Sequence, residues 1–481
     1  MARLSLAAIA SAVHGELKLG EPPPEGGAGH LVGGYSIDSR TAGAGDLFFA
    51  IVGPRLDGHE FVKEAVGKGA VGAVVATGGP GRYPGAGALI RVQDTTRALQ
   101  DLGAHVRRMR PLKVVGITGS AGKTTAKELA AAVAAERFRT MKSEGNLNNT
   151  YGLPLTLLRL PEDSEVAVLE MGMSTKGEIA RLAEIADPDI GVLLCVLRVH
   201  LEHFGSLEKI AEAKGELFRG MRRDAVAVYN ADDPWTAKLA RSFKGPRLAY
   251  GIHARKVDVA GEAIAIEGLS GSIFALRAGG QRETVRLHLP GRHNVYNALA
   301  AATVGCALGL DLWAIRRALE SVRPAAMRGV LHRLPNGVEV LDDSYNSNPA
   351  AMAKAIELLA DARPGGRRIL VAGDMLELGS YETRAHEEVG EQVADAGLDL
   401  FVAVGPRSRG AADAALARMK PQGPVEVRHF ADADAAAPFV VQACGPGDLV
   451  LVKGSRGMRM ERVVQALVRA AGATAAGGGA H

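Results

Sequence analysis

The sequence predicts an α/β protein of several domains, and three observations support this fold class. The chain has 481 residues, more than a single hydrophobic core usually organises. Apolar runs of strand length alternate with segments of helical periodicity along most of it. Several of these runs end in or beside glycine, as strands do at the ligand-binding edge of an open parallel sheet. We therefore expect parallel sheets covered by helices.

The first unit, residues 1–110, is expected to be a small α/β domain. Its strand candidates are "DLFFAIVG", "AVGAVVATG" and "GALIRV", and "GHEFVKEAVGKGA" between the first two has helical spacing. The initial "LSLAAIASAV" resembles a secretion signal only faintly, and its spacing suits one face of a short helix. Pro111 marks the boundary, because the residue before a proline disfavours helix.

The second unit, residues 111–323, is expected to be a parallel sheet with helices on both faces. Its strand candidates "EVAVLEMG", "IGVLLCVL" and "DAVAVYN" are separated by amphipathic helices. Residues 250–290 change to alternating, glycine-interrupted stretches, which predict an antiparallel appendage. The segment after it, "LPGRHNVYNALAAATVGCALG", returns to helix.

The third unit, residues 324–481, is expected to begin with a hairpin around Asn336-Gly337. Three strands that end in or beside glycine follow, "RRILVAGD", "LDLFVAVG" and "GDLVLVKGS". The tail, residues 473–481, is low in complexity and is expected to be disordered.

The composition argues against several classes of protein. A net charge of +4 is nearly balanced, and 4% aromatic residues are few for stacking bases, so we expect no nucleic-acid partner. Cys195, Cys306 and Cys444 are too scattered for a disulfide framework or a metal site. No apolar run is long enough to span a bilayer. We expect a cytoplasmic protein with reduced cysteines and no membrane insertion.

The stretch "KVVGITGSAGKTTAKELAAAV", residues 113–133, predicts a buried strand, a glycine-rich turn and a helix. Backbone N–H groups in such a turn form a site for phosphate, and the helix N-terminus adds partial positive charge. Lys123 would reach the β- and γ-phosphates, and the Thr124 hydroxyl would bind Mg²⁺. The usual first glycine is replaced by Ile117, so a chance Gly-Lys-Thr is the alternative. The strand and helix on either side favour a nucleotide site.

Two further residues follow strand candidates at the same expected edge of the sheet. Glu170 ends "EVAVLEMG", and His200 lies in "VHLEHFGS". A carboxylate and an imidazole there could hold divalent cations between phosphate and acceptor. Each residue alone is more often structural, as a helix cap or a hydrogen-bonded histidine. Their shared location favours a metal site.

Ten motifs occur in an order that resembles the Mur ligases, the cytoplasmic amide-forming enzymes of bacterial peptidoglycan synthesis. The resemblance extends from about Ser36 to Arg456. The motifs are "GITGSAGKTT", "GNLNNTYGLPLTLL", "VLEMGM", "HLEHFGS", "EAKGELF", "NADD", "GRHNVYNALAA", "DDSYNSNP", "GDMLELG" and "LVKGSR". Three of them, "GNLNN", "DDSYNSNP" and "GDMLELG", resemble most the member that joins D-alanyl-D-alanine to UDP-N-acetylmuramoyl-tripeptide.

The resemblance implies three α/β domains, which would bind the uridine end of the substrate, ATP, and the incoming dipeptide in chain order. The central one would be a P-loop-type ATPase domain and the last one Rossmann-like. ATP would phosphorylate the terminal carboxylate of the tripeptide, and the amine would attack the acyl phosphate. The products would be the UDP-muramoyl-pentapeptide, ADP and phosphate. The implied cofactors are ATP and two Mg²⁺ ions, and we expect a monomer.

The nucleotide and metal residues of the family match the following positions. The ATP loop corresponds to Thr118, Gly119, Ser120, Ala121, Gly122, Lys123 and Thr124. Glu170 and His200 match Mg²⁺ ligands, and Lys214 matches a lysine that family members carry as a carbamate, which would bind the second Mg²⁺. From the sequence alone, Lys214 is more readily a surface lysine on a helix. The adenine-side motif and its C-terminal counterpart correspond to Asn294, Asn297 and Asp343, and helix capping by Asn294 is the alternative.

The substrate-side motifs are shorter and have structural alternatives. Those next to the dipeptide correspond to Tyr345, Asn346 and Asn348, and a polar turn before Pro349 is the alternative. The uridine-diphosphate side corresponds to Ser36, Asp38, Ser39 and Arg40, where Arg40 could pair with phosphate. The passage between the sugar nucleotide and the γ-phosphate corresponds to Asn146, Asn148 and Asn149, and turn formation is the alternative.

The chain departs from the family at residues 194–200, "LCVLRVH", where relatives usually have T-N-[IV]-G-P-A-H. Cys195 replaces an amide side chain, and Leu197-Arg198 replace a Gly-Pro turn, so the approach of His200 to a metal is in question.

Other functions remain open at this point. A sibling ligase that adds the third amino acid, or a folate polyglutamate-type ligase, would share the phosphate loop. A nucleotide-dependent switch or binding protein is the alternative from another class. A ligase should release phosphate only when both acceptor and amine are present, whereas a switch would hydrolyse ATP without them.

Overall fold

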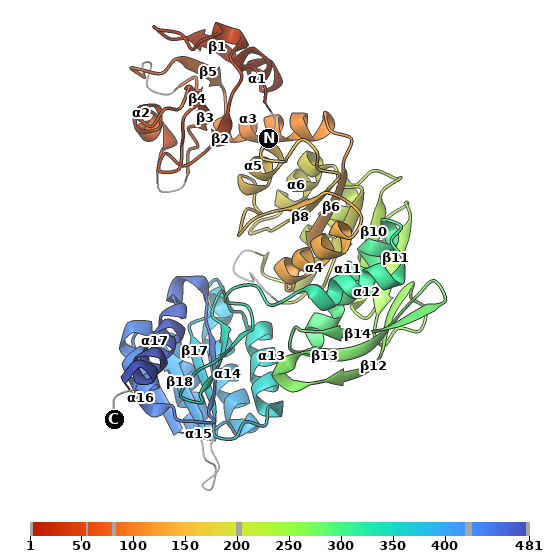
Figure 1. The fold of residues 1–481 in the computed structure, drawn as a ribbon, viewed down its shortest axis with the longest axis vertical. Helices are drawn as coiled ribbons and strands as arrows, with labels where there is room; N and C mark the ends of the chain where they lie inside the picture. The colour runs from red at the N-terminus through yellow and green to blue at the C-terminus, as the bar shows by residue number, and fades with distance from the viewer. Residues whose placement is uncertain (1–2, 54–55, 79–82, 199–203, 419–425, 478–481) are drawn as a thin grey trace.

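The computed structural model describes residues 3–53, 56–78, 83–198, 204–418 and 426–477, with side chains up to residue 472. The chain forms three α/β units, each with its own sheet, which follow one another along a crescent (Figure 1). The mixed α/β class expected from the sequence is confirmed. No helix in the described ranges is long and apolar enough to cross a membrane.

The N-terminal unit is a five-stranded sheet in the order β1-β5-β4-β3-β2. Only β1 is antiparallel to its neighbour. Apolar side chains of the sheet pack against α1 and α3, so the N-terminal apolar segment is part of this core. The three expected strands are present, but the short β1 and β2 were not foreseen. The strands are β1 (Glu16–Leu19), β2 (Gly34–Ser36), β3 (Asp46–Phe49), β4 (Gly72–Ala76) and β5 (Ala88–Val92), and the helices are α1 (Leu6–Ala12), η1 (Gly27–Gly29), η2 (Gly58–Phe61), α2 (Val62–Gly67) and α3 (Thr95–Arg108).

The central unit is a nine-stranded sheet in the order β14-β13-β12-β11-β10-β9-β6-β8-β7. From β7 across the sheet to β12, including β6, each strand pairs in parallel with the next, and β13 and β14 continue the sheet in antiparallel pairing. The stretch 250–290 is therefore antiparallel in part, but it extends the main sheet and is not a separate appendage. The strands are β6 (Lys113–Thr118), β7 (Thr140–Lys142), β8 (Val166–Glu170), β9 (Ile190–Leu193), β10 (Val226–Asn230), β11 (Arg247–Gly251), β12 (Val259–Ile266), β13 (Ser272–Ala278) and β14 (Gln281–Leu287).

Helices cover both faces of the central sheet, as a parallel sheet requires. On one face α4, α11 and α12 form one apolar core with the strands, and on the other α5, α6, α8, α9 and α10 form a second. The helices are α4 (Lys123–Ala135), α5 (Gly152–Leu158), α6 (Glu178–Ala186), α8 (Leu207–Lys214), α9 (Glu216–Gly220), α10 (Pro234–Ser242), η3 (Gly268–Ser270), α11 (Arg292–Ala307) and α12 (Leu312–Ser321).

The C-terminal unit is a six-stranded sheet in the order β15-β16-β20-β17-β18-β19. The expected hairpin is β15 and β16, and the three glycine-ended strands pair in parallel. The strands are β15 (Val330–Arg333), β16 (Glu339–Asp343), β17 (Arg368–Gly373), β18 (Leu400–Val404), β19 (Glu426–Phe430) and β20 (Leu449–Lys453). The helices are α13 (Pro349–Asp361), η4 (Gly379–Tyr381), α14 (Glu382–Ala396), α15 (Ser408–Arg418), α16 (Ala433–Ala443), η5 (Arg456–Met458) and α17 (Glu461–Gly477).

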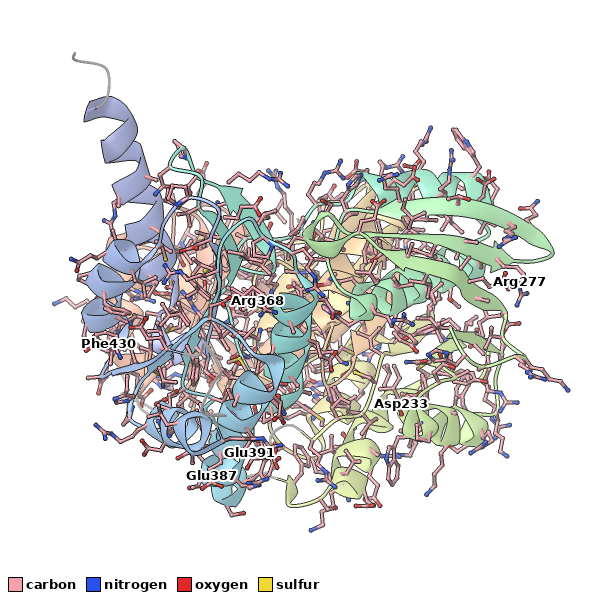
Figure 2. The ribbon with its side chains drawn as sticks, turned by 90° about the horizontal axis from the view of Figure 1, so that it is seen from below. Asp233, Arg277, Arg368, Glu387, Glu391 and Phe430 are labelled. Carbon is pink, nitrogen blue, oxygen red and sulfur yellow. The ribbon has the colours of Figure 1, made fainter. Side chains whose placement is uncertain are left out.

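The last helix corrects one expectation about the tail. Helix α17 continues to Gly477, so residues 473–477 are helical, where we expected disorder. Alanine dominates this segment and is the best helix former, so the low-complexity composition does not prevent helix. The helix extends away from the body of the molecule (Figure 2). Residues 478–481 lie outside the described ranges.

Two junctions connect the units. Arg107, on α3, is 7% exposed, and its guanidinium donates to the carbonyl oxygens of Ala186 and Asp187 and to the Asp189 carboxylate. It therefore fastens the N-terminal unit to the central one. At the other junction, Leu269 in η3, at the turn between β12 and β13, packs against the apolar core of the C-terminal unit. Figure 2, seen from below, shows Arg277 of β13 and Phe430 of β19 on opposite sides of the view.

Candidate active site

The phosphate loop connects β6 to α4 at the carboxyl edge of the central sheet. Gly122 precedes the helix with φ +81°, a conformation that residues with a side chain rarely adopt. The Lys123 ammonium donates to the carbonyl oxygen of Gly119 at 3.1 Å, so its side chain folds back over the loop. Thr118 is buried, and its hydroxyl donates to the carbonyl oxygen of Met171 at 2.9 Å. The strand, the glycine turn and the helix that the sequence predicts here are therefore present.

The two asparagines of "HNVYN" lie directly against this loop. A Cβ atom on Gly122 would be 2.3 Å from Oδ1 of Asn297, so the loop needs glycine there for contact as well as for backbone conformation. The Asn297 amide donates to Oδ1 of Asn294 at 3.0 Å, and the Asn294 amide donates to the carbonyl oxygen of Pro290. The residue that caps α11 is Gly291, so the alternative role of Asn294 as a helix cap is wrong.

A second contact fixes α11 relative to the sheet. The Tyr296 hydroxyl donates to the Asp232 carboxylate at 3.0 Å, and this carboxylate also accepts three backbone N–H groups, of Ile252, His253 and Ala254. Burial acts to raise the pKa of Asp232, but these hydrogen bonds lower it on balance. The motifs "NADD" and "HNVYN", far apart in the sequence, are thus joined.

Glu170 ends β8 beside the phosphate loop and is 4% exposed. Its carboxylate accepts the Thr124 hydroxyl at 2.9 Å on one oxygen and the Asn148 amide at 2.8 Å on the other. It therefore connects the expected nucleotide side of the site to the expected substrate side. His200 and the nearby His203 lie outside the described residues.

The oxygen atoms around Glu170 fit a hard divalent cation. Ligands at right angles around Mg²⁺, with bonds of about 2.0–2.1 Å, are separated by about 2.9 Å. The Thr124 hydroxyl and the Glu170 carboxylate, hydrogen-bonded to each other at 2.9 Å, are two adjacent oxygen donors that could both turn to such a cation. Among the described residues, no group of three or more histidine, cysteine, aspartate and glutamate side chains converges as a metal site. The donor set suits a cation that keeps water and phosphate oxygens as its other ligands.

Lys214 is buried at the end of α8, and the expectation of a surface lysine is wrong. Its side chain is 2% exposed. Burial, with a smaller contribution from the Lys123 charge, lowers the pKa of the Lys214 amine from 10.5 to about 7. A substantial fraction of the amine is therefore uncharged near neutral pH.

The segment "LCVLRVH" departs from the usual motif, but the chain up to Leu197 is hydrogen-bonded to the phosphate loop. The Ser120 N–H donates to the carbonyl oxygen of Cys195, and the Leu197 N–H donates to the Ser120 hydroxyl at 2.9 Å. Asp233, labelled in Figure 2, accepts the N–H of Val196. Burial raises the pKa of the Cys195 thiol, which is directed at the carbonyl oxygen of Ala121. The substituted residues keep this segment against the loop.

The C-terminal motif "DDSYNSNP" follows β16 at the carboxyl edge of the third sheet. The Asp343 carboxylate pairs with the Lys453 ammonium at 2.5 Å. The same ammonium donates to the carbonyl oxygen of Asn346. Tyr345 lies under the guanidinium of Arg328, 4.0 Å from the ring centre. Asn348 caps α13 through the N–H of Ala351, so the structural alternative holds for its side chain.

Three residues of this cluster, Lys453, Arg456 and Arg328, were not among the expected site residues. Lys453 is 3% exposed, and the Arg456 guanidinium is 5.9 Å from the Tyr345 ring centre. A charge at the end of the apolar strand "LVLVK" was the available signal for Lys453. Nothing local marks Arg328, which approaches Tyr345 only through the tertiary fold.

His293, next to Asn294, relates the central and C-terminal motifs in space. His293 is exposed to solvent, yet enough protein surrounds it to lower its pKa, chiefly by burial. The charge of Asp343 acts to raise this pKa and that of Lys453 to lower it, so the two motifs lie within electrostatic range of each other.

The uridine-side residues lie apart, at the end of β2 in the N-terminal unit. Ser36 and Ser39 are buried, and their hydroxyls donate to the carbonyl oxygen of Asp38 and to Glu64. The Arg40 guanidinium pairs with the Asp38 carboxylate at 2.6 Å. This bond lowers the pKa of Asp38 to about 2. Arg40 remains largely exposed and accessible to an anion.

The three asparagines of residues 146–149 have different surroundings. Asn148 contacts Glu170, as above, whereas Oδ1 of Asn149 accepts the N–H groups of Tyr151 and Gly152 at the start of α5. The turn-forming alternative therefore describes Asn149. The carbonyl oxygen of Asn146 accepts the N–H of Asn148.

Comparisons with known protein families cover most of the chain. Residues 31–137 match the catalytic domain of the Mur ligase family, residues 117–305 the Mur ligase middle domain, and residues 327–456 the Mur ligase glutamate ligase domain. Two curated relatives are named UDP-N-acetylmuramoyl-tripeptide--D-alanyl-D-alanine ligase. The one from Bacillus subtilis is 35% identical over 91% of this chain and 93% of its own, and the one from Escherichia coli is 35% identical over 97% and 99%.

Solved structures extend the similarity to the whole fold. A crystal structure of MurF from Acinetobacter baumannii has a TM-score of 0.86 and 30% identity, covering 98% of this chain and 99% of its own. MurF ligase from Thermotoga maritima in complex with ADP has a TM-score of 0.78 and 30% identity, covering 92% and 98%. The similarity includes the arrangement of all three units, because it covers both chains almost completely.

Proposed function

The chain belongs to the Mur ligase family, and on that premise we propose that it joins D-alanyl-D-alanine to UDP-N-acetylmuramoyl-tripeptide using ATP. It is an ATP-dependent amide-forming ligase of peptidoglycan synthesis. The products are the UDP-muramoyl-pentapeptide, ADP and inorganic phosphate. The sibling, folate-type and switch alternatives are not favoured, because three relatives at 34–35% identity over 90% or more of this chain all carry the name of the D-alanyl-D-alanine ligase.

The reaction needs two bond changes. The γ-phosphoryl group of ATP moves from ADP to an oxygen of the tripeptide's terminal carboxylate, which makes the carbonyl carbon electrophilic and turns that oxygen into part of a phosphate leaving group. The uncharged amine of D-alanyl-D-alanine then attacks this carbon, phosphate leaves with that oxygen, and the nitrogen loses a proton to give the amide. The phosphate loop and Lys123 would stabilise the negative charge on the transferred group.

One observation carries the proposal: the Glu170 carboxylate is bonded to Thr124 at 2.9 Å and to Asn148 at 2.8 Å. Thr124 begins the helix of the phosphate loop, and Asn148 belongs to the motif expected to line the passage from the sugar nucleotide. A phosphoryl donor and a carboxylate acceptor must meet at such a junction for transfer to occur.

We propose that Thr124, Glu170 and His200 hold one Mg²⁺ and that a carbamate on Lys214 holds a second. A bound Mg²⁺ would shield the phosphate charges and orient the γ-phosphoryl group. The carbamate forms when the uncharged Lys214 amine adds CO₂ and releases a proton. The low pKa of this amine, about 7, supports the proposal because only the uncharged form reacts with CO₂.

The remaining roles follow the three units. We propose residues 1–110 for the uridine end, with Ser36, Asp38, Ser39 and Arg40, residues 111–323 for ATP, and residues 324–481 for the dipeptide, with Tyr345, Asn346 and Asn348. Asn294, Asn297 and Asp343 would serve ATP, and Asn146, Asn148 and Asn149 the passage between substrates. We propose a cytoplasmic monomer, since ATP is available in the cytoplasm; light scattering of the purified protein tests the oligomeric state.

The test is a reaction of the purified protein with UDP-muramoyl-tripeptide, ATP and Mg²⁺. D-alanyl-D-alanine should give the pentapeptide, detected by mass spectrometry, whereas single amino acids should give no product. Phosphate release should require both acceptor and amine. Tripeptide labelled with ¹⁸O in its terminal carboxylate should transfer one labelled oxygen to phosphate, and phosphate without the label would overturn the acyl phosphate.

A further inference from the structure

Lys127 is a buried lysine that the reaction described above does not use. It lies on α4, one helical turn after Lys123 and Thr124, and is 2% exposed. Burial of an ammonium group costs free energy unless good partners replace water, and a leucine or methionine would fill this position without that cost. The contacts of the Lys127 ammonium therefore need an explanation.

The ammonium has one short hydrogen bond and one longer ion pair. Its Nζ donates to the carbonyl oxygen of Ser143 at 2.7 Å and lies 3.3 Å from Oε1 of Glu128. Glu128 is 24% exposed, and its other oxygen pairs with Lys142, which is exposed. Glu128 therefore also pairs with the exposed Lys142, so it does not depend on Lys127 alone. The Ser143 carbonyl oxygen accepts its hydrogen bond from Lys127.

Ser143 is held at three points. Its own N–H donates to the carbonyl oxygen of Val168 at 3.0 Å, and its hydroxyl accepts the N–H of Glu170 at 2.9 Å. Its carbonyl is the acceptor for Lys127. Ser143 is 2% exposed and follows β7, where the chain leaves the sheet to form the segment that contains Asn148.

These bonds form a closed set around Glu170. Ser143 fixes the Glu170 backbone, while Thr124 and Asn148 fix its carboxylate. Lys127 comes from the same helix as Thr124 and fixes Ser143. Helix α4 therefore fixes the position of the Thr124 hydroxyl. Through Ser143 it also fixes the backbone of Glu170 and the start of the segment that contains Asn148.

We propose that Lys127 is a positioning residue that aligns Glu170 and Asn148 with the phosphate loop through the Ser143 carbonyl. This inference rests on the proposed function in so far as Glu170 binds a divalent cation with ATP. The Lys127 ammonium is engaged by the Ser143 carbonyl oxygen and by Glu128, so its effect on the site passes through Ser143. Outer partners of metal ligands typically change metal affinity or activity about 10- to 100-fold when removed.

The experiment compares Lys127→Met with Lys142→Met, which removes the exposed partner of the same Glu128. Ser143→Ala removes the hydroxyl that accepts the Glu170 N–H, and a double variant combines it with Lys127→Met. The readouts are the Mn²⁺ dissociation constant in the presence of ADP, by electron paramagnetic resonance, the Mg²⁺ concentration for half-maximal product formation, and the melting temperature.

Lys127→Met and Ser143→Ala should each weaken Mn²⁺ binding about 10-fold and raise the Mg²⁺ requirement to match. The double variant should weaken it by less than the product of the two factors, because both changes act on one set of bonds. Lys142→Met should bind Mn²⁺ as the wild type does. These results support the inference even where the melting temperature of Lys127→Met falls.

Three results would overturn it. The first is wild-type Mn²⁺ affinity in folded Lys127→Met, which would make the residue structural only. The second is equal weakening in Lys142→Met, which would assign the effect to Glu128. The third concerns the case in which Lys127→Met does not fold. In that case, wild-type Mn²⁺ affinity in Ser143→Ala would overturn the inference. If the wild type binds Mn²⁺ with ADP but makes no amide, the proposed function fails and the binding data still decide the role of Lys127.

Discussion

Lys123 is the residue whose loss should separate chemistry from folding most cleanly. In Lys123→Ala, amide formation should fall by at least about 10²–10³-fold, because the developing charge on the transferred phosphoryl group loses its ammonium partner. The fold should persist, since the Lys123 ammonium bonds only to the Gly119 carbonyl among the described residues. Phosphate release and thermal melting measure the two effects.

Lys176→Ala is the matched control, because Lys176 is an exposed lysine on the loop after β8. It should keep wild-type turnover. Normal turnover in Lys123→Ala would contradict the assignment of the phosphate loop.

Lys214 predicts a pH dependence of stability with a definite sign. Burial lowers the pKa of the amine to about 7 in the folded chain, against 10.5 for the ordinary value that applies to the unfolded chain. Between these values the unfolded chain binds more protons, so in CO₂-free buffer the free energy of unfolding should rise with pH, by at most about 1.4 kcal/mol per unit. Below pH 7 the amine is protonated in both the folded and the unfolded chain. The folded chain then bears the full free-energy cost of burying the ammonium charge.

Lys214→Met removes this cost. The variant should be more stable than the wild type at pH 7 and below, and the difference should shrink toward pH 10.5. Urea denaturation at a series of pH values measures it, with the exposed Lys209→Met on the same helix as the control. Parallel stability profiles for wild type and Lys214→Met would contradict the buried, uncharged amine.

The carbamate makes a separate prediction for the same residue. Lys214→Ala should lose activity, and a small carboxylate such as acetate should restore part of it by occupying the place of the carbamate. Turnover is the measurement. Full activity of Lys214→Ala without acetate would show that no carbamate is needed.

At the scale of the element, the entry into α4 is defined by Gly122. Gly122→Ala would have both a strained backbone, since φ is +81°, and a Cβ atom 2.3 Å from the Asn297 side chain. Gly177 precedes α6 with φ +92°, but a Cβ atom added there would meet nothing within 4 Å, so Gly177→Ala isolates the backbone effect. Gly122→Ala should lose ADP affinity about 10-fold or more, and Gly177→Ala should not.

Calorimetric titration of ADP with Mg²⁺ measures the affinity, and thermal melting measures the strain. Both variants should lose about 1–2 kcal/mol of stability from the backbone alone. Equal ADP affinities for the two variants would contradict the close approach of α11 to the phosphate loop.

At the scale of the whole molecule, the expected reaction site is divided between units. The phosphate loop lies on the central sheet, and the cluster around Tyr345 lies on the C-terminal sheet. Since the amine must reach the acyl phosphate, the units should close on each other when ATP and acceptor bind. The radius of gyration from X-ray scattering should decrease with UDP-muramoyl-tripeptide and a non-hydrolysable ATP analogue.

Lys123→Ala is the control for closure, because it should bind the analogue weakly and change less. Unchanged scattering of the wild type with both ligands would contradict a site completed by domain movement.

Much of the fold was predictable because strands and helices follow local periodicity. The three glycine-ended strands of the C-terminal unit, the hairpin at Asn336-Gly337 and the turn before α4 are all present where expected. Short edge strands such as β1 were missed, since four residues carry too little periodicity to be distinguished from loop. The helical end of α17 was missed because its low complexity outweighed its alanine content.

By itself the sequence determined the strand–turn–helix of the phosphate loop, the order of the motifs and the family. These depend on backbone conformation and residue order, which a local pattern records. Only the tertiary structure decided that Lys214 and Lys127 are buried, that Asn297 contacts Gly122, and that Glu170 joins Thr124 to Asn148. Burial and such contacts arise between residues far apart in the chain, so they exist only once the sheets have assembled.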